Sequence, residues 1–423
     1  MSSGALQRRV TKNLLEIQTK PSRDDPPVFA ALKDDKKLED ITCLIVGAPD
    51  TPYHYGFFFF DMHIPSDFPF KPPVVKIKTT DSSHVRFNPN LYAEGKVCLS
   101  ILGTWHGDTM ETWSPTFSLE YILRAIQGMI MNGAPYYNEP GFEQKHKESA
   151  VLASQYSAKI LHETLRVGVC DVLEGILSGT AMSPFDGDIK QQFLWRYDSY
   201  REVCEKNKGL DGSAFVKAPF EGKGNQCMGT FRYASLATRL MGIQEALLAE
   251  TLRWRTLGEG STPPAVAYTQ PTGVGVDGVF CQLLSPSNPY LWHLGDETFA
   301  LEVVFPVHDE LERELPRVSV LSPQPLFHPN FTQGGGPIRS IPWLTTPRNQ
   351  RRSLAHIYDA VRSLLKDPPL QVQVSWVNTE AAHCYFSQDP VQKALYASRN
   401  VPARVATGGI QKRAREEEII ILD

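Results

Sequence analysis

Apolar residues recur along the first 130 residues in two different rhythms. Residues 3–18 and 119–130 carry them at intervals of three and four, which predicts amphipathic helices. The runs 41–46, 56–64 and 74–77 are rich in β-branched and aromatic residues and are bounded by turn residues, which predicts strands. Together these elements predict an α+β domain.

The segment 79–117 follows neither rhythm and is rich in Asn, Gly, Ser and Pro. An irregular stretch of this length inside a compact domain is usually functional. Beyond residue 150 the pattern becomes helical and then returns to strands. The elements expected there are helices at 156–177, 189–206 and 233–254, a linker at 258–264, strands at 298–305 and 317–321, and a helix at 354–365 with Ser353 as its N-cap.

Length and composition bound the class of protein. A chain of 423 residues is too long for one typical core and suits two or three domains. The formal net charge is −4, and the chain has neither a long basic stripe nor an apolar run of about 20 residues. Nucleic acid and membranes are therefore not expected partners. The N-terminus lacks an apolar signal core, so no secretory signal is expected.

Cysteine usage indicates a reducing compartment. The seven cysteines are scattered, none stands in a CxxC pair, and their number is odd. These features argue against a structural zinc site or a disulfide framework. Separately, no metal and no other cofactor is expected. A cytoplasmic or nuclear location fits best, where a single cysteine in a special setting can serve as a nucleophile.

Two segments of the chain resemble each other in order and spacing. The first extends 37 residues from Tyr53 to Asn90, and the second extends 40 residues from Tyr290 to Asn330. Both are followed, 48 residues later, by another asparagine. The repeat predicts two α+β domains with a common frame, and chance agreement is the alternative.

The two copies differ at one chemically important position. Cys98 lies eight residues after Asn90, whereas Ile338 lies eight residues after Asn330. A cysteine thiolate is nucleophilic, and its thioester stays reactive toward amines. A cysteine protease is disfavoured, because neither His84 nor His106 has an evident orienting partner. Aminolysis of a thioester needs only a polar donor for the oxyanion and an acid to orient or deprotonate the amine.

Residues 1–150 resemble the catalytic core of ubiquitin-conjugating enzymes. The NPN triplet at 88–90, the CLSILGTW segment and the YYNEPGFE segment resemble the large subclass with a C-terminal helical extension, and the resemblance continues more weakly to about residue 250. It implies a conjugating core with an antiparallel four-stranded meander sheet and flanking helices. The motif residues are Tyr55, Gly56, Phe60, Pro65, Phe68, Pro69, Pro72 and Pro73, the NPN triplet, GKVCLSIL around Cys98, and the WSP triplet at 113–115.

The resemblance also implies roles for individual residues. Cys98 matches the thioester cysteine, Asn90 the asparagine that supports the reactive loop or the oxyanion, and Glu139 the acid that positions the incoming lysine. A structural turn asparagine and a solvated loop acid are the alternatives for the latter two. The matches to docking residues are Arg8, Arg9 and Lys12 for the activating enzyme, and Phe70, Trp113, Ser114 and Pro115 for a RING-type or other ligase.

Two departures from the family pattern stand out. Asn88 replaces the usual histidine of the triplet, so an imidazole contact within that loop is missing. Cys98 and Trp113 are also unusually far apart, and the extra segment 103–112 is expected to form a flap near the active site.

The C-terminal part resembles binding modules. Residues 288–398 resemble a conjugating-enzyme variant domain without the cysteine, on the basis of residues 288–290, 328–330 and 378–382. Such variants bind a modifier or pair with an active enzyme, and a purely structural module is the alternative. The chain ends in EEEIIILD, which resembles a SUMO-interacting motif. Its apolar residues are Ile419, Ile420, Ile421 and Leu422.

These features lead to two hypotheses. In the first, the protein is an enzyme that accepts ubiquitin or a ubiquitin-like modifier on Cys98 from an activating enzyme and passes it to a substrate lysine. In the second, it is a scaffold that binds SUMO or ubiquitin through its second domain and tail. The expected domains are the core at 1–150, the helical extension at 151–257, the linker at 258–264, the variant domain at 265–400 and the flexible tail at 401–423.

Overall fold

The structure, a computed structural model, describes the chain from residue 3 to residue 322 with several gaps. The predicted helix at 354–365, the tail motif, Ile338, and the triplets around Asn330 and Asn378 lie outside the described residues. The described ranges are 3–19, 26–34, 37–105, 112–142, 147–222, 228–260, 280–285, 287–295, 300–306 and 314–322.

The described elements alternate between a sheet, a set of helices and a second sheet. The strands are β1 (Val28–Asp34), β2 (Lys37–Val46), β3 (Phe57–His63), β4 (Val74–Ile77), β5 (Phe280–Ser285), β6 (Asn288–Gly295), β7 (Ala300–Val304) and β8 (Arg317–Ser322). The α-helices are α1 (Ser3–Thr19), α2 (Leu119–Ala125), α3 (Lys147–Glu163), α4 (Val172–Leu177), α5 (Asp186–Asn207) and α6 (Tyr233–Gly258). Short 3₁₀ turns are η1 (Ser100–Leu102), η3 (Pro135–Asn138) and η5 (Lys208–Leu210), and π-helical turns are η2 (Ile126–Ile130) and η4 (Thr164–Asp171).

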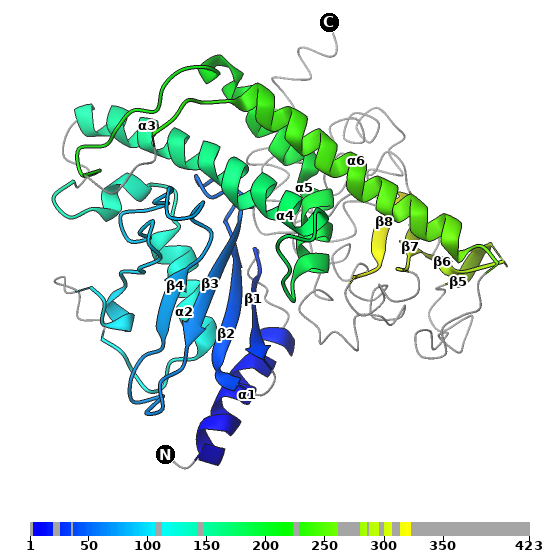
Figure 1. The fold of residues 1–423 in the computed structure, drawn as a ribbon, viewed down its shortest axis with the longest axis horizontal. Helices are drawn as coiled ribbons and strands as arrows, with labels where there is room; N and C mark the ends of the chain where they lie inside the picture. The colour runs from blue at the N-terminus through cyan, green and yellow to red at the C-terminus, as the bar shows by residue number, and fades with distance from the viewer. Residues whose placement is uncertain are drawn as a thin grey trace, which may run out of the picture. The chain divides into compact units, whose positions relative to one another are not determined.

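The first four strands form one antiparallel sheet in the order β1-β2-β3-β4 (Figure 1). The apolar stripe of α1, including Val10 and Leu14, is buried, and α1 contacts both β1 and α2. Asn13 joins the two helices, since its Oδ1 accepts a hydrogen bond from the Leu119 N–H at 2.8 Å. The α+β class and the meander sheet expected from the sequence are confirmed.

The chain divides into two compact units, and the division falls within two helices. The first unit contains the described residues up to Ile189 and from Tyr200 to Ala246. The second contains Lys190–Ser199 of α5 and the described residues from Leu247 onward. The conjugating-type core and most of the helical extension therefore share one unit.

Helix α3, turn η4 and helix α4 run without interruption, and η4 packs closely on the start of β3. The site of contact is Gly168, where an added Cβ would meet the Gly56 Cα at 3.6 Å. Gly56 is tighter still, because its Cβ would lie 2.5 Å from Cγ2 of Thr164 and 2.8 Å from Cε2 of Phe58. Glycine at residue 56 thus permits the extension to rest on the sheet.

Replacing Gly56 with alanine is expected to destabilise the fold by about 1–3 kcal/mol, because the added methyl group overpacks the contact with η4. Chemical denaturation of the full chain measures this change. Gly128→Ala is the matched control, since a methyl group there meets nothing within 4 Å. Equal stabilities of the two variants would contradict this packing.

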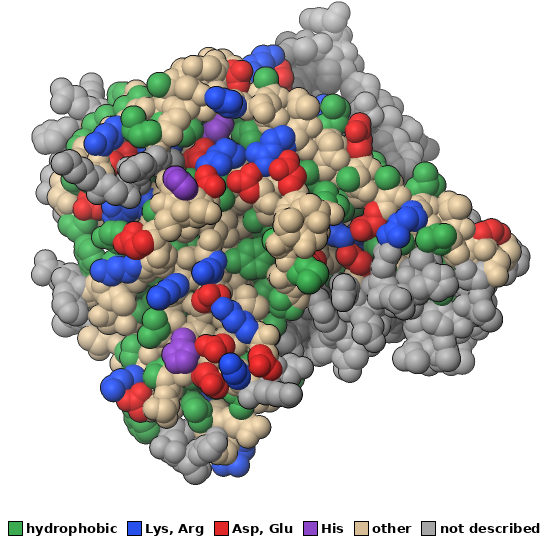
Figure 2. All heavy atoms as spheres, in the orientation of Figure 1, with side chains coloured by type: hydrophobic (Ala, Val, Ile, Leu, Met, Phe, Trp, Pro, Cys, Tyr) green, Lys and Arg blue, Asp and Glu red, His purple; other side chains and the backbone are tan. Residues whose placement is uncertain are grey.

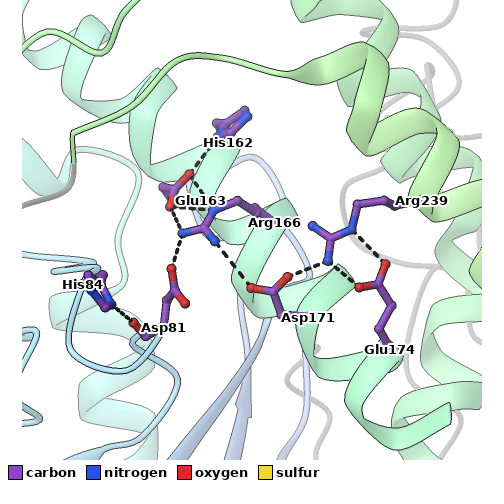
Figure 3. Close-up of polar contacts among 8 residues, drawn as sticks. All are labelled: Asp81, His84, His162, Glu163, Arg166, Asp171, Glu174 and Arg239. Carbon is purple, nitrogen blue, oxygen red and sulfur yellow. Dashed lines mark hydrogen bonds and ion pairs between the residues drawn. The ribbon is translucent and has the colours of Figure 1, made fainter. Parts of the chain in front are cut away.

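A network of ion pairs also ties the extension to the core (Figure 3). Arg166 on η4 donates to Asp81 Oδ2 at 2.8 Å and to Glu163 Oε2 at 2.5 Å. Arg239 on α6 donates to Asp171 Oδ1 at 2.5 Å and also pairs with Glu174. Because Asp81 lies in the loop that leads to the NPN triplet, the network connects that loop with two elements of the extension.

Acid is expected to weaken this network through Glu163. Burial alone would raise the pKa of Glu163, but hydrogen bonds from His162 and Arg166 outweigh it and lower the pKa below its ordinary value of 4.5. A carboxyl group with a lowered folded-state pKa contributes stability above its unfolded-state pKa, and that contribution is lost as the pH falls through the folded-state value.

The free energy of unfolding should therefore fall less steeply below pH 4.5 in Glu163→Gln than in the parent protein. Urea titrations at a series of pH values measure how steeply the free energy of unfolding falls with pH in each protein. Glu205→Gln removes an exposed carboxylate of α5 and serves as the control. Identical slopes for the parent and Glu163→Gln would exclude this role of Glu163.

In the second unit, strands β5 to β8 form another antiparallel sheet, in the order β5-β6-β7-β8. This order is the same as that of the first sheet. The aligned tyrosines are not equivalent, however: Tyr290 lies within β6, whereas Tyr53 lies in the turn after β2. The alignment of the repeat is therefore wrong at this position.

Buried ion pairs hold the helix segments of the second unit. Lys190 donates to Glu250 at 2.9 Å and to Glu314 at 2.6 Å. Arg317 donates to Glu250 at 2.6 Å and stacks on the Trp254 ring. Each buried cation thus has carboxylate partners, as burial requires.

On the face drawn in Figure 2, acidic and basic side chains of the described residues are interspersed. None of the helices in the described ranges is long and apolar enough to cross a membrane. Nor do the described residues contain a group of three or more His, Cys, Asp or Glu side chains that could hold a metal ion.

Candidate active site

Cys98 follows a tight hairpin that begins at the NPN triplet. The Tyr92 N–H donates to the Lys96 carbonyl at 2.9 Å, and Gly95 takes a positive φ of 102° that favours glycine. The hairpin returns the chain so that Cys98 lies beside Asn90. Cys98 as a residue is 3% exposed.

Asn90 and Cys98 are paired through two hydrogen bonds. The Cys98 N–H donates to the Asn90 carbonyl at 2.9 Å, and the Asn90 side-chain amide donates to the Cys98 carbonyl at 2.9 Å. On the other side, the Thr104 hydroxyl donates to the Val97 carbonyl at 2.7 Å and accepts from the Leu99 N–H at 2.9 Å. The backbone at Cys98 is therefore fixed from both directions.

Asn88, which replaces the usual histidine, has a fully buried side chain with several hydrogen-bond partners. Its Nδ2 donates to the Tyr53 hydroxyl and to the Ile130 carbonyl, both at 2.8 Å. Its Oδ1 accepts from the Asn90 N–H at 2.8 Å and from Asn138 Nδ2 at 3.3 Å. The Asn88 amide thus supports the loop in which the imidazole contact is missing.

The contact between Asn88 and Asn138 brings the predicted acid toward the reactive loop. Asn138 ends η3, and Glu139 follows it directly with a side chain that is 29% exposed. The three predicted catalytic residues, Cys98, Asn90 and Glu139, are therefore joined through one chain of hydrogen-bonded asparagines.

Arg86 is a site residue that sequence reasoning missed. Its guanidinium donates to the Asn88 carbonyl at 3.2 Å and to the Pro89 carbonyl at 2.5 Å, and it stacks 4.0 Å above the Tyr92 ring. Its Nη2 lies 3.9 Å from Glu139 Oε2, although the Arg86 side chain is only 11% exposed. A charged residue two positions before the triplet was the only signal in the sequence.

The other cysteines with described side chains are poor candidates for nucleophiles. Burial raises the pKa of Cys170 and of Cys204 to about 12. Burial also raises the pKa of Cys43 far above its usual range. These thiols stay protonated near neutral pH, and only a thiolate attacks efficiently.

The three predicted docking residues on α1 do not behave alike. Arg8 and Lys12 are exposed, whereas the Arg9 guanidinium donates to the carbonyls of Pro115 and Phe117 at 3.2 and 3.4 Å. Arg9 therefore attaches α1 to the WSP loop and is less available to a partner.

The predicted ligase-docking residues come together from two loops. The Trp113 indole N–H donates to the Pro69 carbonyl at 2.7 Å, and its ring lies 6.1 Å from that of Phe68. Phe70 is 68% exposed beside this contact. Ser114 is half-buried and bonds to Thr116, whereas Pro115 is exposed, so the triplet reaches the surface at Pro115.

Comparison with known proteins agrees with this geometry. Residues 9–163 match the ubiquitin-conjugating enzyme family. Over 239 residues the chain is 41% identical to ubiquitin-conjugating enzyme E2 Z of Danio rerio. The matched region spans 56% of this chain and 68% of that protein. The chain belongs to the ubiquitin-conjugating enzyme family. The resemblance to the C-terminally extended subclass is likewise confirmed.

Two further relatives show how far the likeness extends. E2 Z of Homo sapiens is 40% identical over 240 residues, 57% of this chain and 63% of that protein. The human dual E2 ubiquitin-conjugating enzyme/E3 ubiquitin-protein ligase BIRC6 is 40% identical over 169 residues, 39% of this chain and 4% of that protein. As a conjugating enzyme this chain is a transferase, and the family acts with an activating enzyme, ubiquitin and a ligase.

Proposed function

We propose that this conjugating enzyme accepts ubiquitin or a ubiquitin-like modifier as a thioester on Cys98 and transfers it to a substrate lysine. The pairing of Cys98 with Asn90 is the observation that carries the proposal, because two hydrogen bonds fix the backbone that carries this thiol. The raised pKa values of the other described thiols support the same choice.

Two acyl transfers make up the reaction. In the first, Cys98 Sγ attacks the thioester carbonyl carbon of the modifier on the activating enzyme; a new C–S bond forms, and the activating enzyme's thiol leaves with the proton given up by Cys98. In the second, the lysine Nζ attacks the same carbon, the bond to Cys98 breaks, and the thiolate of Cys98 is released. The surplus amine proton passes to Glu139 or through it to water.

Asn90 and Glu139 serve different parts of this sequence. Asn90 holds the carbonyl of Cys98 and so fixes the position of the acyl group that Sγ carries. Glu139 orients the lysine, and Arg86 keeps the Glu139 carboxylate directed toward the reactive loop. Arg8 and Lys12 are exposed for an activating enzyme, and Phe70 and Pro115 are exposed for a ligase.

A loading assay tests the proposal. The full chain is incubated with ATP, a modifier and a cognate activating enzyme, using a panel of such pairs, and is then resolved with and without reducing agent. The expected result is a one-to-one adduct with at least one modifier that disappears on reduction. No reducible adduct with any member of the panel would refute the proposal.

A scaffold role is the second candidate, and the repeated strand order of β5 to β8 favours it. In this role the second sheet and the EEEIIILD tail recruit a modifier-marked partner. Titration of a peptide of residues 411–423 with SUMO tests the tail directly. Saturable binding that is lost when the four apolar residues become alanine is expected, and unchanged binding of that variant would exclude the motif.

A further inference from the structure

An aromatic cluster joins the helical extension to the segment that carries Glu139. Tyr136 lies three residues before the acid and Phe142 three residues after it, and their ring centroids are 5.7 Å apart. Tyr156 of α3 lies 6.1 Å from Tyr136, and Phe220 lies 5.3 Å from Tyr136, 5.2 Å from Phe142 and 5.3 Å from Tyr156. Phe220 thus contacts all three other members of the cluster.

Glu139 and Phe142 are the two ends of a single turn, and Tyr136 lies in η3 just before it. The Phe142 N–H donates to the Glu139 carbonyl at 3.2 Å, and Gly141 inside the turn has a positive φ of 82°. Fixing the rings of Tyr136 and Phe142 therefore fixes the backbone on both sides of Glu139. The core holds the residue before the acid, since Asn138 donates to Asn88 and to the Ile130 carbonyl. Phe220 adds ring contacts on both sides of Glu139.

Phe220 is itself held by a buried ion pair of the extension. Lys159 of α3 donates to both carboxylate oxygens of Glu221 at 2.5 Å, and the Ala218 N–H donates to Glu221 Oε2 at 2.7 Å. Lys159 and Glu221 are almost entirely buried. A buried pair with these additional hydrogen bonds gives the loop one defined position, and Phe220 precedes Glu221 directly.

We propose that the extension takes part in lysine transfer, with Phe220 as a positioning residue that holds the Glu139 turn. This inference rests on the proposed roles of Cys98 and Glu139. Misplacing a group by about 1 Å can slow a reaction by up to about 10²-fold. Loosening the turn impairs the step that uses Glu139, which is attack by the amine. Loading of Cys98 involves no acceptor amine and does not depend on the turn.

Single-turnover discharge of the full-length enzyme tests this inference. The enzyme is loaded, the activating enzyme is stopped by removing ATP, and free lysine is added over a range of concentrations. Phe220→Ala is expected to reduce the maximal rate of discharge about 10-fold while loading stays within about two-fold of the parent. Phe220→Leu keeps most of the apolar volume and should restore most of the rate.

Phe215→Ala is the matched control. Phe215 lies in the same loop and is buried, but its ring packs on His162 and Phe231 and not on the cluster. It should lose comparable stability and leave discharge near the parent rate. A loss of discharge in Phe215→Ala equal to that in Phe220→Ala would reduce Phe220 to a general structural role and overturn the inference.

A double-mutant cycle separates positioning from folding. If Phe220 acts through Glu139, then Phe220→Ala should cause no further loss of discharge in a Glu139→Gln background. Equal fold-losses in both backgrounds would overturn the inference, as would an unchanged rate in Phe220→Ala. Failure of the parent enzyme to load at all would instead refute the proposed function, so the two failures are distinguishable.

Discussion

Replacing Cys98 with serine should yield an adduct that survives reducing agent and transfers poorly. The alkoxide of serine is a much worse leaving group than a thiolate, so an oxygen ester on residue 98 reacts slowly with amines. We expect transfer to free lysine to fall by about 10³-fold or more, as is common when a nucleophile is removed. Gels run with and without thiol, followed by alkaline hydrolysis, measure the adduct and its chemistry.

Two controls accompany this variant. Cys98→Ala should give no adduct of either kind, because no nucleophilic atom remains. Cys204→Ala should load normally, because the pKa of the Cys204 thiol is raised to about 12. A reducible adduct on Cys98→Ala, or a loss of loading in Cys204→Ala, would mean that the thioester forms elsewhere.

Replacing Glu139 with glutamine should leave loading unchanged and slow discharge to lysine by about 10²-fold, which is typical of losing a positioned acid–base group. The substitution keeps the size and one hydrogen-bonding oxygen of the side chain, so the turn from Glu139 to Phe142 should persist. Single-turnover discharge at saturating lysine measures the effect. The rate should recover partly at high pH, where more of the lysine is already deprotonated.

Glu94→Gln is the control for this charge change. Glu94 is an exposed acid in the hairpin before Cys98, and it has no assigned role. Its replacement should alter discharge by less than about two-fold. Equal effects of Glu94→Gln and Glu139→Gln would mean that the slower discharge comes from the overall electrostatic field around the site and not from Glu139.

The strands of the first sheet show how far sequence patterns reach. The prediction at 74–77 coincides with β4, and those at 41–46 and 56–64 coincide with most of β2 and β3. Strand β1 was missed because its Ala-rich centre follows two prolines and does not read as a strand. Strand β6 was missed because Pro289 lies within it, and proline normally argues against a central strand.

The sequence did not predict the π-helical turn within the predicted helix or the distant contacts that the turn makes. The predicted helix at 119–130 is α2 followed by the π-helical turn η2. The turn directs the Gln127 amide inward, where it donates to the carbonyls of Pro26 and Val46 at 3.0 and 2.9 Å. Pro26 lies 101 residues and Val46 lies 81 residues before Gln127 in the sequence, so no local pattern predicts these contacts.

In the site, too, local contacts could be predicted from the sequence and distant contacts could not. The pairing of Asn90 with Cys98 could be predicted from their spacing, because one local hairpin joins the two residues. The replacement of the usual histidine by Asn88 was visible in the sequence, but the hydrogen-bond partners of Asn88, Tyr53 and Ile130, could not be predicted. Phe220 could not be predicted, because its relation to Glu139 arises only when the extension folds back on the core.

Mapping the modified cysteine tests the central claim most directly. After loading, free thiols are blocked with one alkylating reagent, the thioester is cleaved with hydroxylamine, and the thiol released is labelled with a second reagent before digestion and mass spectrometry. The second label should appear on Cys98 alone among the seven cysteines. A second label on any of the other six, with Cys98 carrying the first reagent, would contradict the account.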